Sequence, residues 1–296
     1  MVETRKKFSR IKPNVWMLEE DGEKFSVKRY TDPFEARKIR EVHERLEMAS
    51  YPFTVPVTKK GNDLIVVQPW LENAQSVDFS KQADRRASIV ALEALHATQT
   101  VVKWEDVTFL RRYPLLDKWE MRLERFQNNL PIIENYLQKD AIQLIEWYSE
   151  QALNRLQTAS AREVPHTILH GDVVHHNLLK TEEGTVFLID FDLACVGNPD
   201  IEIGLWLHRV LPNVGYNAAG LFSEEPRLQV LGPQAIAMMQ YPNELLREWS
   251  YLATLPLAQQ HSMANHLNSF TERALQSWDE LCYFSNTLLE DDPTYP

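Results

Sequence analysis

The feature that most constrains the fold is a change of hydrophobic pattern near residue 70. Up to Gln68 the chain consists, apart from one stretch with helical spacing, of short apolar and β-branched runs separated by turn residues, a pattern typical of strands. From about Ser80 the apolar positions recur mostly at helical spacing. The sequence therefore predicts an α+β protein with a small antiparallel sheet and one helix in residues 1–70, and a larger, mostly helical part in residues 71–296.

The first seventy residues predict strands around one helix. The stretch "VWMLEEDGEKFSVKRY" predicts a hairpin, because Asp21-Gly22 tolerates the positive φ of a tight turn. The next stretch, "DPFEARKIREVHERLEMA", predicts a helix with Asp32 as its N-cap and Pro33 at its first position. Residues 51–73, "YPFTVPVTKKGNDLIVVQPWLEN", predict two further strands. Later helices are expected at Gln82–Thr98, Leu115–Asn129 and Ile132–Leu156, with several more from Ile201 to Leu289.

Residues 169–192, "LHGDVVHHNLLKTEEGTVFLIDFD", interrupt the helical part with a second hairpin. A turn centred between Glu182 and Glu183 places Asn177 roughly across from Leu188 and Asp190 roughly across from His175. The residues between are apolar on both faces, so the hairpin is expected to be anchored in a core. Its polar end would then be held rigidly, as a catalytic site requires.

Three interpretations of this hairpin remain open: a phosphoryl-transfer site, a histidine-rich metal site, or an ordinary hairpin with solvated ends. Asn177 and Asp190 supply hard oxygen ligands suited to Mg²⁺ that carries nucleotide phosphates. A separate carboxylate, Asp172, could accept the proton of an attacking hydroxyl. The neighbouring His175 and His176 cannot easily aim at one ion, and no spaced Cys or His completes a tetrahedral set.

The combined motifs resemble a known family, the aminoglycoside phosphotransferases and choline kinases, which are small-molecule kinases with a bilobal protein-kinase-like fold. "HGDVVHHN" resembles the catalytic loop and "LIDFD" the metal-binding segment. "FSVKRY" resembles the strand whose lysine, here Lys28, reaches the nucleotide phosphates, and Glu41 fits the glutamate that orients it. "VVQPWLEN" resembles the hinge between a nucleotide-binding lobe, residues 1–70, and a helical lobe, residues 71–296. Adenine would meet the backbone of Gln68, Pro69, Trp70 and Leu71.

This resemblance implies an ATP-dependent phosphotransferase that moves the γ-phosphoryl group to a hydroxyl of a small molecule, such as an aminoglycoside-, amino-alcohol- or sugar-like acceptor. Asp172 would be the catalytic base, and Asn177 and Asp190 would bind Mg²⁺. His170 would brace the catalytic loop. Asp192 could contact a second metal or hold the turn of its segment, and both interpretations stay open.

Other features favour a different function. The first hairpin has no glycine-rich phosphate loop, which weighs against tight nucleotide binding. Glu202 stands where an aspartate is usual in "GNPDIEIG", and Asn73 stands where a glycine is common, but these two departures weigh little. The stretch "RRYPLLDKWEMRLERF" is similar to family members that serve in endospore coats. The alternative is therefore a catalytically weak or inactive kinase-like protein with a structural or assembly role.

The charge balance bears on possible partners. A formal net charge of −11 argues against a broad electrostatic grip on nucleic acid or on an anionic membrane surface. No apolar run is long enough to cross a bilayer, and we expect a cytoplasmic protein. The identity of the acceptor and the oligomeric state are left open by the sequence.

Overall fold

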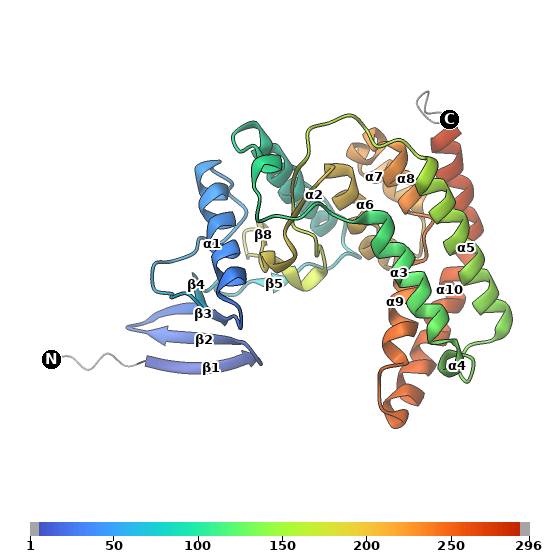
Figure 1. Cartoon of the computed structure of the whole chain (residues 1–296), viewed down its shortest axis with the longest axis horizontal. Coiled ribbons are helices and arrows are strands. Elements are labelled where there is room, and N and C mark those ends of the chain that lie inside the picture. The colour runs from blue at the N-terminus through green and yellow to red at the C-terminus, as the bar shows by residue number, and fades with distance from the viewer. Residues whose placement is uncertain (1–5, 291–296) are drawn as a thin grey trace. The chain divides into compact units, whose positions relative to one another are not determined.

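A computed structural model describes residues 6–290, which divide into two compact units (Figure 1). The first unit comprises Met1–Arg112 and Pro165–Pro199, and the second comprises Tyr113–Val164 and Asp200–Pro296. A small antiparallel sheet lies near the N-terminus and the C-terminal part is mostly helical, so the predicted α+β class is confirmed. The division into a nucleotide-binding and a helical lobe near residue 70 concerns function and stays a prediction.

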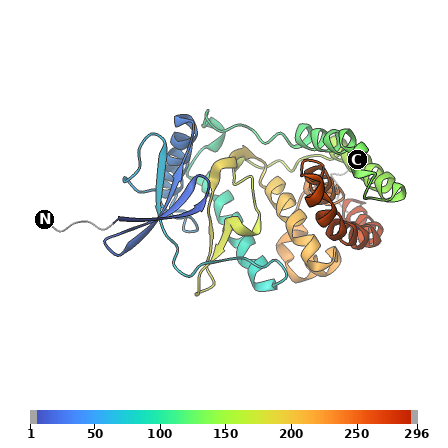
Figure 2. The same cartoon turned by 90° about the horizontal axis from the view of Figure 1, so that it is seen from below.

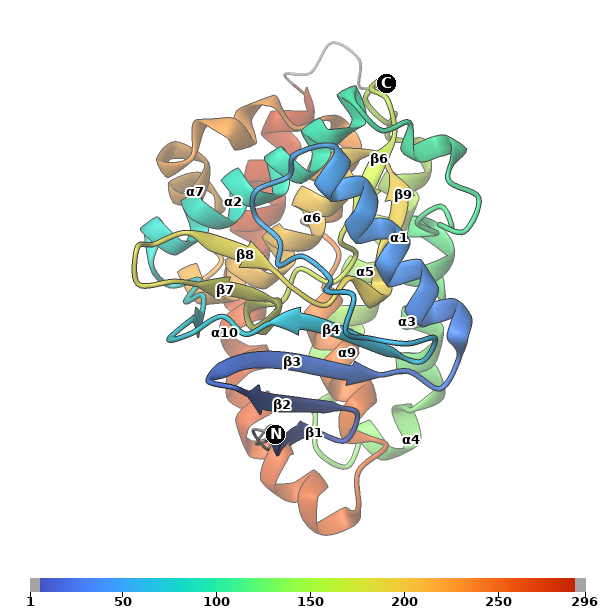
Figure 3. The same cartoon turned by 90° about the vertical axis from the view of Figure 1, so that its left-hand side faces the viewer.

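The first unit begins with a four-stranded antiparallel sheet in the order β1-β2-β3-β4 (Figure 3). Its strands are β1 (Lys6–Lys12), β2 (Val15–Glu20), β3 (Glu23–Arg29) and β4 (Ile65–Pro69). Asp21 and Gly22 form the predicted turn, with φ of 54° and 85°. Phe25 and Val27 pack with Leu18 and Val67 in the core of this sheet, which leaves Lys28 on the opposite face.

Helix α1 (Pro33–Met48) packs against β4 and starts as predicted (Figure 2). The side chain of Asp32 accepts a hydrogen bond of 2.9 Å from the amide of Phe34. The strand expected just after this helix does not form, and only Thr54 makes an isolated bridge, to Leu188. Pro52 and Pro56 flank Thr54 and have no N–H to donate to a ladder, which explains the correction.

The remainder of the first unit carries two small sheets and one long helix. Strands β5 (Gln75–Ser76), β7 (Leu178–Lys180) and β8 (Val186–Leu188) form one sheet, and β6 (Thr167–Leu169) pairs with β9 (Cys195–Gly197) in the other. Helix α2 (Gln82–Ala97) contacts both β6 and β8. Short 3₁₀ turns occur at η1 (Thr98–Thr100), η2 (Trp104–Asp106), η3 (His175–Asn177) and η4 (Phe191–Leu193).

The β7–β8 hairpin forms as predicted, but its register differs by one residue. Leu178 pairs with Leu188, and the amide of Ile189 donates to the carbonyl of Asn177 at 3.0 Å. Asn177 therefore lies opposite Ile189 rather than Leu188. The cause is Gly184, whose φ of 86° adds a residue to the turn and makes a three-residue loop.

The second unit is helical, and α5 and α10 contact each other in it (Figure 1). Its elements are α3 (Leu115–Asn128), α4 (Leu130–Ile133), α5 (Lys139–Thr158), α6 (Pro199–Val210), η5 (Leu211–Val214), α7 (Ala218–Glu224), η6 (Pro226–Val230), α8 (Pro233–Met238), α9 (Asn243–Leu252) and α10 (Leu257–Glu290). The single helix expected over residues 132–156 is thus two helices. Trp119, Trp206, Trp249 and Tyr241 are fully buried in the core. Across residues 6–290, no helix has the length and apolar character needed to span a membrane.

Candidate active site

The site is built around Lys28, which lies on β3 and reaches the turn that follows β8. Its Nζ lies 2.6 Å from Oδ1 of Asp190 and 2.5 Å from Oδ2 of Asp192. Burial opposes the charge of Lys28, but the hydrogen bonds and attraction of the two carboxylates outweigh it and raise the pKa of the lysine above its ordinary value. The structure thus brings Lys28 into contact with Asp190, which lies 162 positions later in the chain.

Asp190 adopts a left-handed backbone conformation, with φ 66° and ψ 63°. Aspartate tolerates this region better than most residues, although such a conformation still costs about 1 kcal/mol or more. Burial alone would raise the pKa of Asp190, but the hydrogen bond and charge of Lys28 lower it below its usual range. The carboxylate is therefore ionised and aimed at the lysine at neutral pH.

Asp192 holds the same turn through contacts that the sequence did not predict. Its Oδ1 accepts a hydrogen bond of 2.8 Å from the hydroxyl of Tyr30, and its carbonyl accepts one of 2.8 Å from Nζ of Lys38 on α1. Burial and the charge of Asp192 raise the pKa of Tyr30, so its phenol stays a donor. Tyr30 lies one residue beyond the end of β3 and two residues after Lys28, so alternation could have placed the two side chains on one face, whereas nothing in the sequence marks Lys38.

The His-Gly-Asp loop packs directly on this turn, and Gly171 permits the close approach. Gly171 has φ of 79°, and a Cβ added there would lie 2.3 Å from the carbonyl oxygen of Leu193. The neighbouring His170 is fully buried; its Nε2 lies 2.8 Å from the carbonyl oxygen of Ile189, and its ring centre lies 4.6 Å from that of Phe191. The loop and the turn are thereby fixed to each other.

Asp172 and Asn177 form a second pair within the site. The side-chain nitrogen of Asn177, Nδ2, donates to the backbone carbonyl oxygen of Asp172 at 3.0 Å and to the carboxylate Oδ2 of Asp172 at 3.1 Å. Asn177 is buried, and Asp172 is partly exposed. Since the nitrogen is engaged, the amide oxygen is the atom that Asn177 can offer to a cation.

A partly buried ion pair fixes the β7–β8 hairpin to α2. Nζ of Lys180 lies 2.6 Å from Oδ1 of Asp84, whose other oxygen accepts from the amide of Asp78 at 2.8 Å. Asp84 is only 2% exposed. A lone aspartate in the first turn of a helix carries no signal of a partner 96 residues away, so the sequence could not reveal this support.

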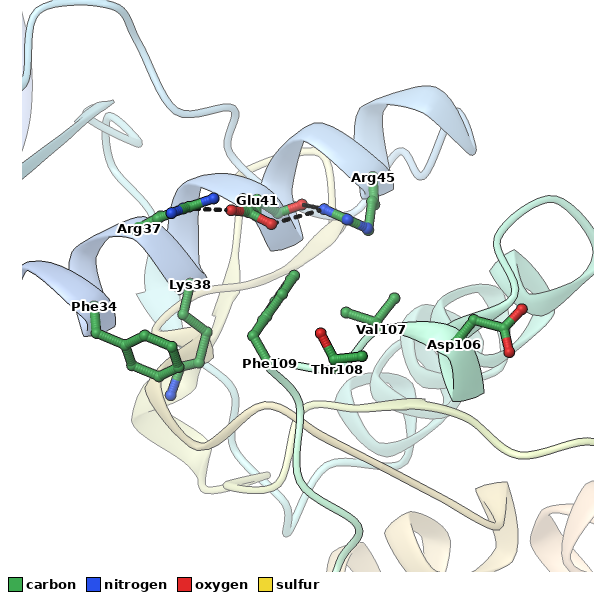
Figure 4. A pocket seen from close by; sticks show the side chains of 9 residues that line it. All are labelled: Phe34, Arg37, Lys38, Glu41, Arg45, Asp106, Val107, Thr108 and Phe109. Atoms are coloured by element: carbon green, nitrogen blue, oxygen red, sulfur yellow. Dashed lines mark hydrogen bonds and ion pairs between the residues drawn. The ribbon is translucent and has the colours of Figure 1, made fainter.

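Glu41 does not meet Lys28 in the structure, contrary to the predicted pairing. Its Oε1 lies 2.7 Å from Nε of Arg37, and its Oε2 lies 3.4 Å from Nη1 of Arg45 (Figure 4). All three side chains line a cavity of about 320 Å³ beside α1. The two arginines flank Glu41 at helical spacing and hold its carboxylate, while Asp190 and Asp192 occupy Lys28.

The four residues of the predicted hinge lie at the end of β4 and just beyond it. The amide of Trp70 donates to the carbonyl of Lys24 at 2.9 Å, and Gln68 pairs with Ser26 in the ladder. Pro69 has no N–H. Alternation along an antiparallel ladder turns the carbonyl of Pro69 away from β3. Of the four residues, Pro69 and Leu71 are therefore the best placed to offer backbone groups to a ligand.

The donor chemistry of the site suits a hard cation. Asp190 offers a carboxylate just after β8, and Asn177 offers an amide oxygen from η3, just before β7. Within residues 6–290, no three or more His, Cys, Asp or Glu side chains gather where they could hold a metal by themselves. The rings of His175 and His176 stand perpendicular to each other, with their centres 5.2 Å apart.

Comparisons with known proteins agree with this geometry. A model described as "Phosphotransferase enzyme family" matches residues 9–231. A search of curated proteins finds no significant match. An aminoglycoside phosphotransferase from Alicyclobacillus acidocaldarius superposes with a TM-score of 0.69 at 15% identity, covering 97% of this chain and 94% of that one.

Two further solved structures have the same fold. Spectinomycin phosphotransferase APH(9)-Ia, in complex with AMP, gives a TM-score of 0.63 at 12% identity over 91% of this chain and 92% of that one. The amicoumacin kinase hAmiN, in complex with AMP-PNP, Ca²⁺ and Ami, gives 0.59 at 14% identity over 92% and 89%. At these identities the similarity establishes the fold.

Proposed function

Because the chain belongs to the phosphotransferase enzyme family, we propose that it transfers the γ-phosphoryl group of ATP to a hydroxyl of a small molecule. The observation that carries this proposal is the convergence of Lys28 with Asp190 in the same unit as Asp172 and Asn177. Phosphoryl transfer needs these parts: a cation for the phosphates, oxygen ligands for a metal, and a carboxylate near the attacking hydroxyl.

Asn177 and Asp190 would hold Mg²⁺, which when bound neutralises charge on the phosphates. Lys28 is the point charge that would bind the phosphates beside them. Its bonds to Asp190 and Asp192 keep the ammonium at the metal-binding carboxylate. The backbone of Pro69 and Leu71 would meet adenine, with Gln68 and Trp70 fixing the strand end. Glu41 would assist Lys28 only after leaving Arg37 and Arg45.

Asp172 would accept the proton of the acceptor hydroxyl. It is partly exposed, and Asn177 and the buried His170 hold its loop in place. A carboxylate oriented in this way can take a proton as the new oxygen–phosphorus bond forms. We propose an aminoglycoside-, amino-alcohol- or sugar-like acceptor, and a cytoplasmic location.

One observation favours the alternative of a kinase-like protein with weak or no activity. The turn between β1 and β2 is formed by Pro13 and Asn14, without a glycine that would let the backbone approach phosphates closely. Such a protein would keep the fold and serve a structural or assembly role. We rank it second because the residues expected to perform the chemistry are all present.

The experiment that separates the two functions is ADP release in the presence of Mg²⁺ and ATP across a panel of aminoglycosides, amino-alcohols and sugars. We expect at least one acceptor to raise ADP release above the acceptor-free rate, and Lys28→Met to abolish the increase. Lys7→Met, an exposed lysine of the same sheet, is the matched control. Nucleotide binding without turnover on any acceptor would favour the structural role.

A further inference from the structure

The second unit contains a cavity whose lining includes none of the residues proposed to carry out phosphoryl transfer. Helices α3 and α9 pack against each other (Figure 1). The cavity is lined by residues of these two helices and their ends, and has a volume of about 850 Å³. Binding sites for organic molecules typically span roughly 300–1,000 Å³. The cavity is therefore large enough for a complete small molecule.

Cationic side chains predominate in its lining. Lys118, Arg122, Arg125 and Arg247 face only two carboxylates, those of Asp117 and Glu248. Glu248 is already engaged, since its Oε1 lies 2.6 Å from Nη2 of Arg247. In a chain whose net charge is −11, this local excess of positive charge singles out the cavity.

Arg122 is the most informative of these residues. It is only partly exposed, and its Nη1 donates to Oδ1 of Asn243, a neutral amide. The nearby Glu244 is held by Arg209 at 2.7 Å and Arg247 at 2.8 Å. Burial has the largest effect and lowers the pKa of Arg122, and the charge of Arg247 acts in the same direction. Tyr241, Tyr113 and Glu244 oppose this shift, but the pKa stays below its ordinary value. A desolvated cation beside a like charge is stabilised by an anion.

Ser250 provides an independent observation. It lines the same cavity and is only 4% exposed, yet its Oγ has no hydrogen-bond partner among the described residues. Buried hydroxyls nearly always have a partner. Rotation of the Ser250 side chain toward the cavity would let a ligand oxygen supply one. Met121 and Tyr251 also line the cavity and are 59% and 55% exposed, so apolar surface is available beside the polar groups.

We propose that the α3–α9 cavity binds a small organic anion, with its carboxylate or phosphate on Arg122 and Ser250 and its apolar body against Met121 and Tyr251. The same chemistry would suit either an acceptor that becomes phosphorylated or an effector that is bound unchanged. The proposal rests on the second unit alone and does not depend on nucleotide binding by the first.

The test is calorimetric titration of the full chain, without nucleotide, with 1-naphthyl phosphate as the probe and 1-naphthol as its uncharged counterpart. We expect the phosphate to bind at least about tenfold more tightly than the naphthol. Arg122→Met should remove that preference, because a charge-assisted hydrogen bond is typically worth about a tenfold change or more. Arg273→Met, which removes a charge from α10 outside the cavity, should bind like the wild type.

If Arg122→Met does not fold, Ser250→Ala still tests the proposal. We expect Ser250→Ala to weaken probe binding severalfold. Unchanged affinity in both variants, or equal affinity for naphthol and naphthyl phosphate, would overturn the proposal. A probe that also carries a hydroxyl, 4-(hydroxymethyl)benzoate, separates the two sources. Its phosphorylation with Mg²⁺-ATP identifies an acceptor, whereas binding without modification identifies an effector.

Discussion

At the scale of single residues, the site depends on how Lys28 is shared between two carboxylates. Asp190 and Asp192 each hold one oxygen within 2.6 Å of its Nζ. Either ion pair alone would be an ordinary contact of a partly buried lysine. The two pairs together keep a cation beside the oxygens that would bind a metal, and they make the charge state of the site matter for folding.

The pH dependence of stability follows from the directions of these pKa shifts. The folded pKa of Asp190 lies below its ordinary value of about 3.9, so its stabilisation is present above that pH and is lost as pH falls through the folded pKa. The folded pKa of Lys28 lies above about 10.4, so its stabilisation is present below that pH and is lost as pH rises through the folded pKa.

We therefore expect the difference in melting temperature between wild type and Lys28→Met to be largest from about pH 5 to 9 and to shrink on either side. Thermal unfolding from pH 2 to 11 measures this difference. Lys7→Met should show no such profile. A difference that stays constant with pH would mean that Lys28 acts through the packing of its stem.

Asp172 offers a prediction that separates binding from chemistry. Asp172→Asn keeps the shape and leaves Asn177 a carbonyl oxygen to donate to, so Mg²⁺-ATP affinity should stay nearly unchanged. Transfer should fall by about 10²–10⁴-fold, the usual contribution of a general base. Asp190→Asn should weaken both nucleotide binding and transfer. If Asp172→Asn turns over at the wild-type rate, Asp172 is not the base.

At the scale of elements, the His-Gly-Asp loop packs directly on the turn after β8, because Gly171 lets their backbones touch. Adding a methyl group at Gly171 brings it 2.3 Å from a carbonyl oxygen, so the loop must move away from the turn. Gly184, in the β7–β8 hairpin, has a similar φ of 86°, with no atom within 4 Å of an added Cβ. An alanine at Gly184 would therefore introduce backbone strain alone, whereas an alanine at Gly171 would introduce the same strain together with a steric clash.

We expect Gly184→Ala to lower the free energy of unfolding by about 1–2 kcal/mol, the cost of a left-handed conformation. Gly171→Ala should cost about 1–3 kcal/mol more, because overpacking adds to the same strain. Urea unfolding of both variants measures the two losses. Equal losses would show that the loop and the turn are not packed together in solution.

At the scale of the whole molecule, local sequence signals predicted most helices and strands. The elements that were not predicted depend on partners that lie far away in the sequence. The cap at Asp32 and the turn at Asp21-Gly22 depend on neighbouring residues, and both formed as predicted. The register of the β7–β8 hairpin shifted because one residue, Gly184, took a positive φ. The pairing of β6 with β9 was not predicted, because each strand has only three residues and its partner lies far along the chain.

The site shows the same limits. Lys28, Asp172, Asn177 and Asp190 could be proposed from the sequence because their motifs are short and ordered along the chain. Asp190 and Lys28 are indeed in contact. The partner of Glu41 was not recognisable, since two arginines, each four residues away on the same helix, compete for its carboxylate. Sequence spacing alone does not decide which of two cations a glutamate meets.

The most direct test of the central claim is Mg²⁺-dependent stabilisation by ATP. At a hundredfold excess over Kd, nucleotide should add about 2.7 kcal/mol to the free energy of unfolding. The part that requires Mg²⁺ should disappear in Asp190→Asn and persist in Asp63→Asn, an exposed control. Stabilisation that is absent, or that is the same with and without Mg²⁺ in every variant, would contradict the assignment of this site to a metal-bound nucleotide.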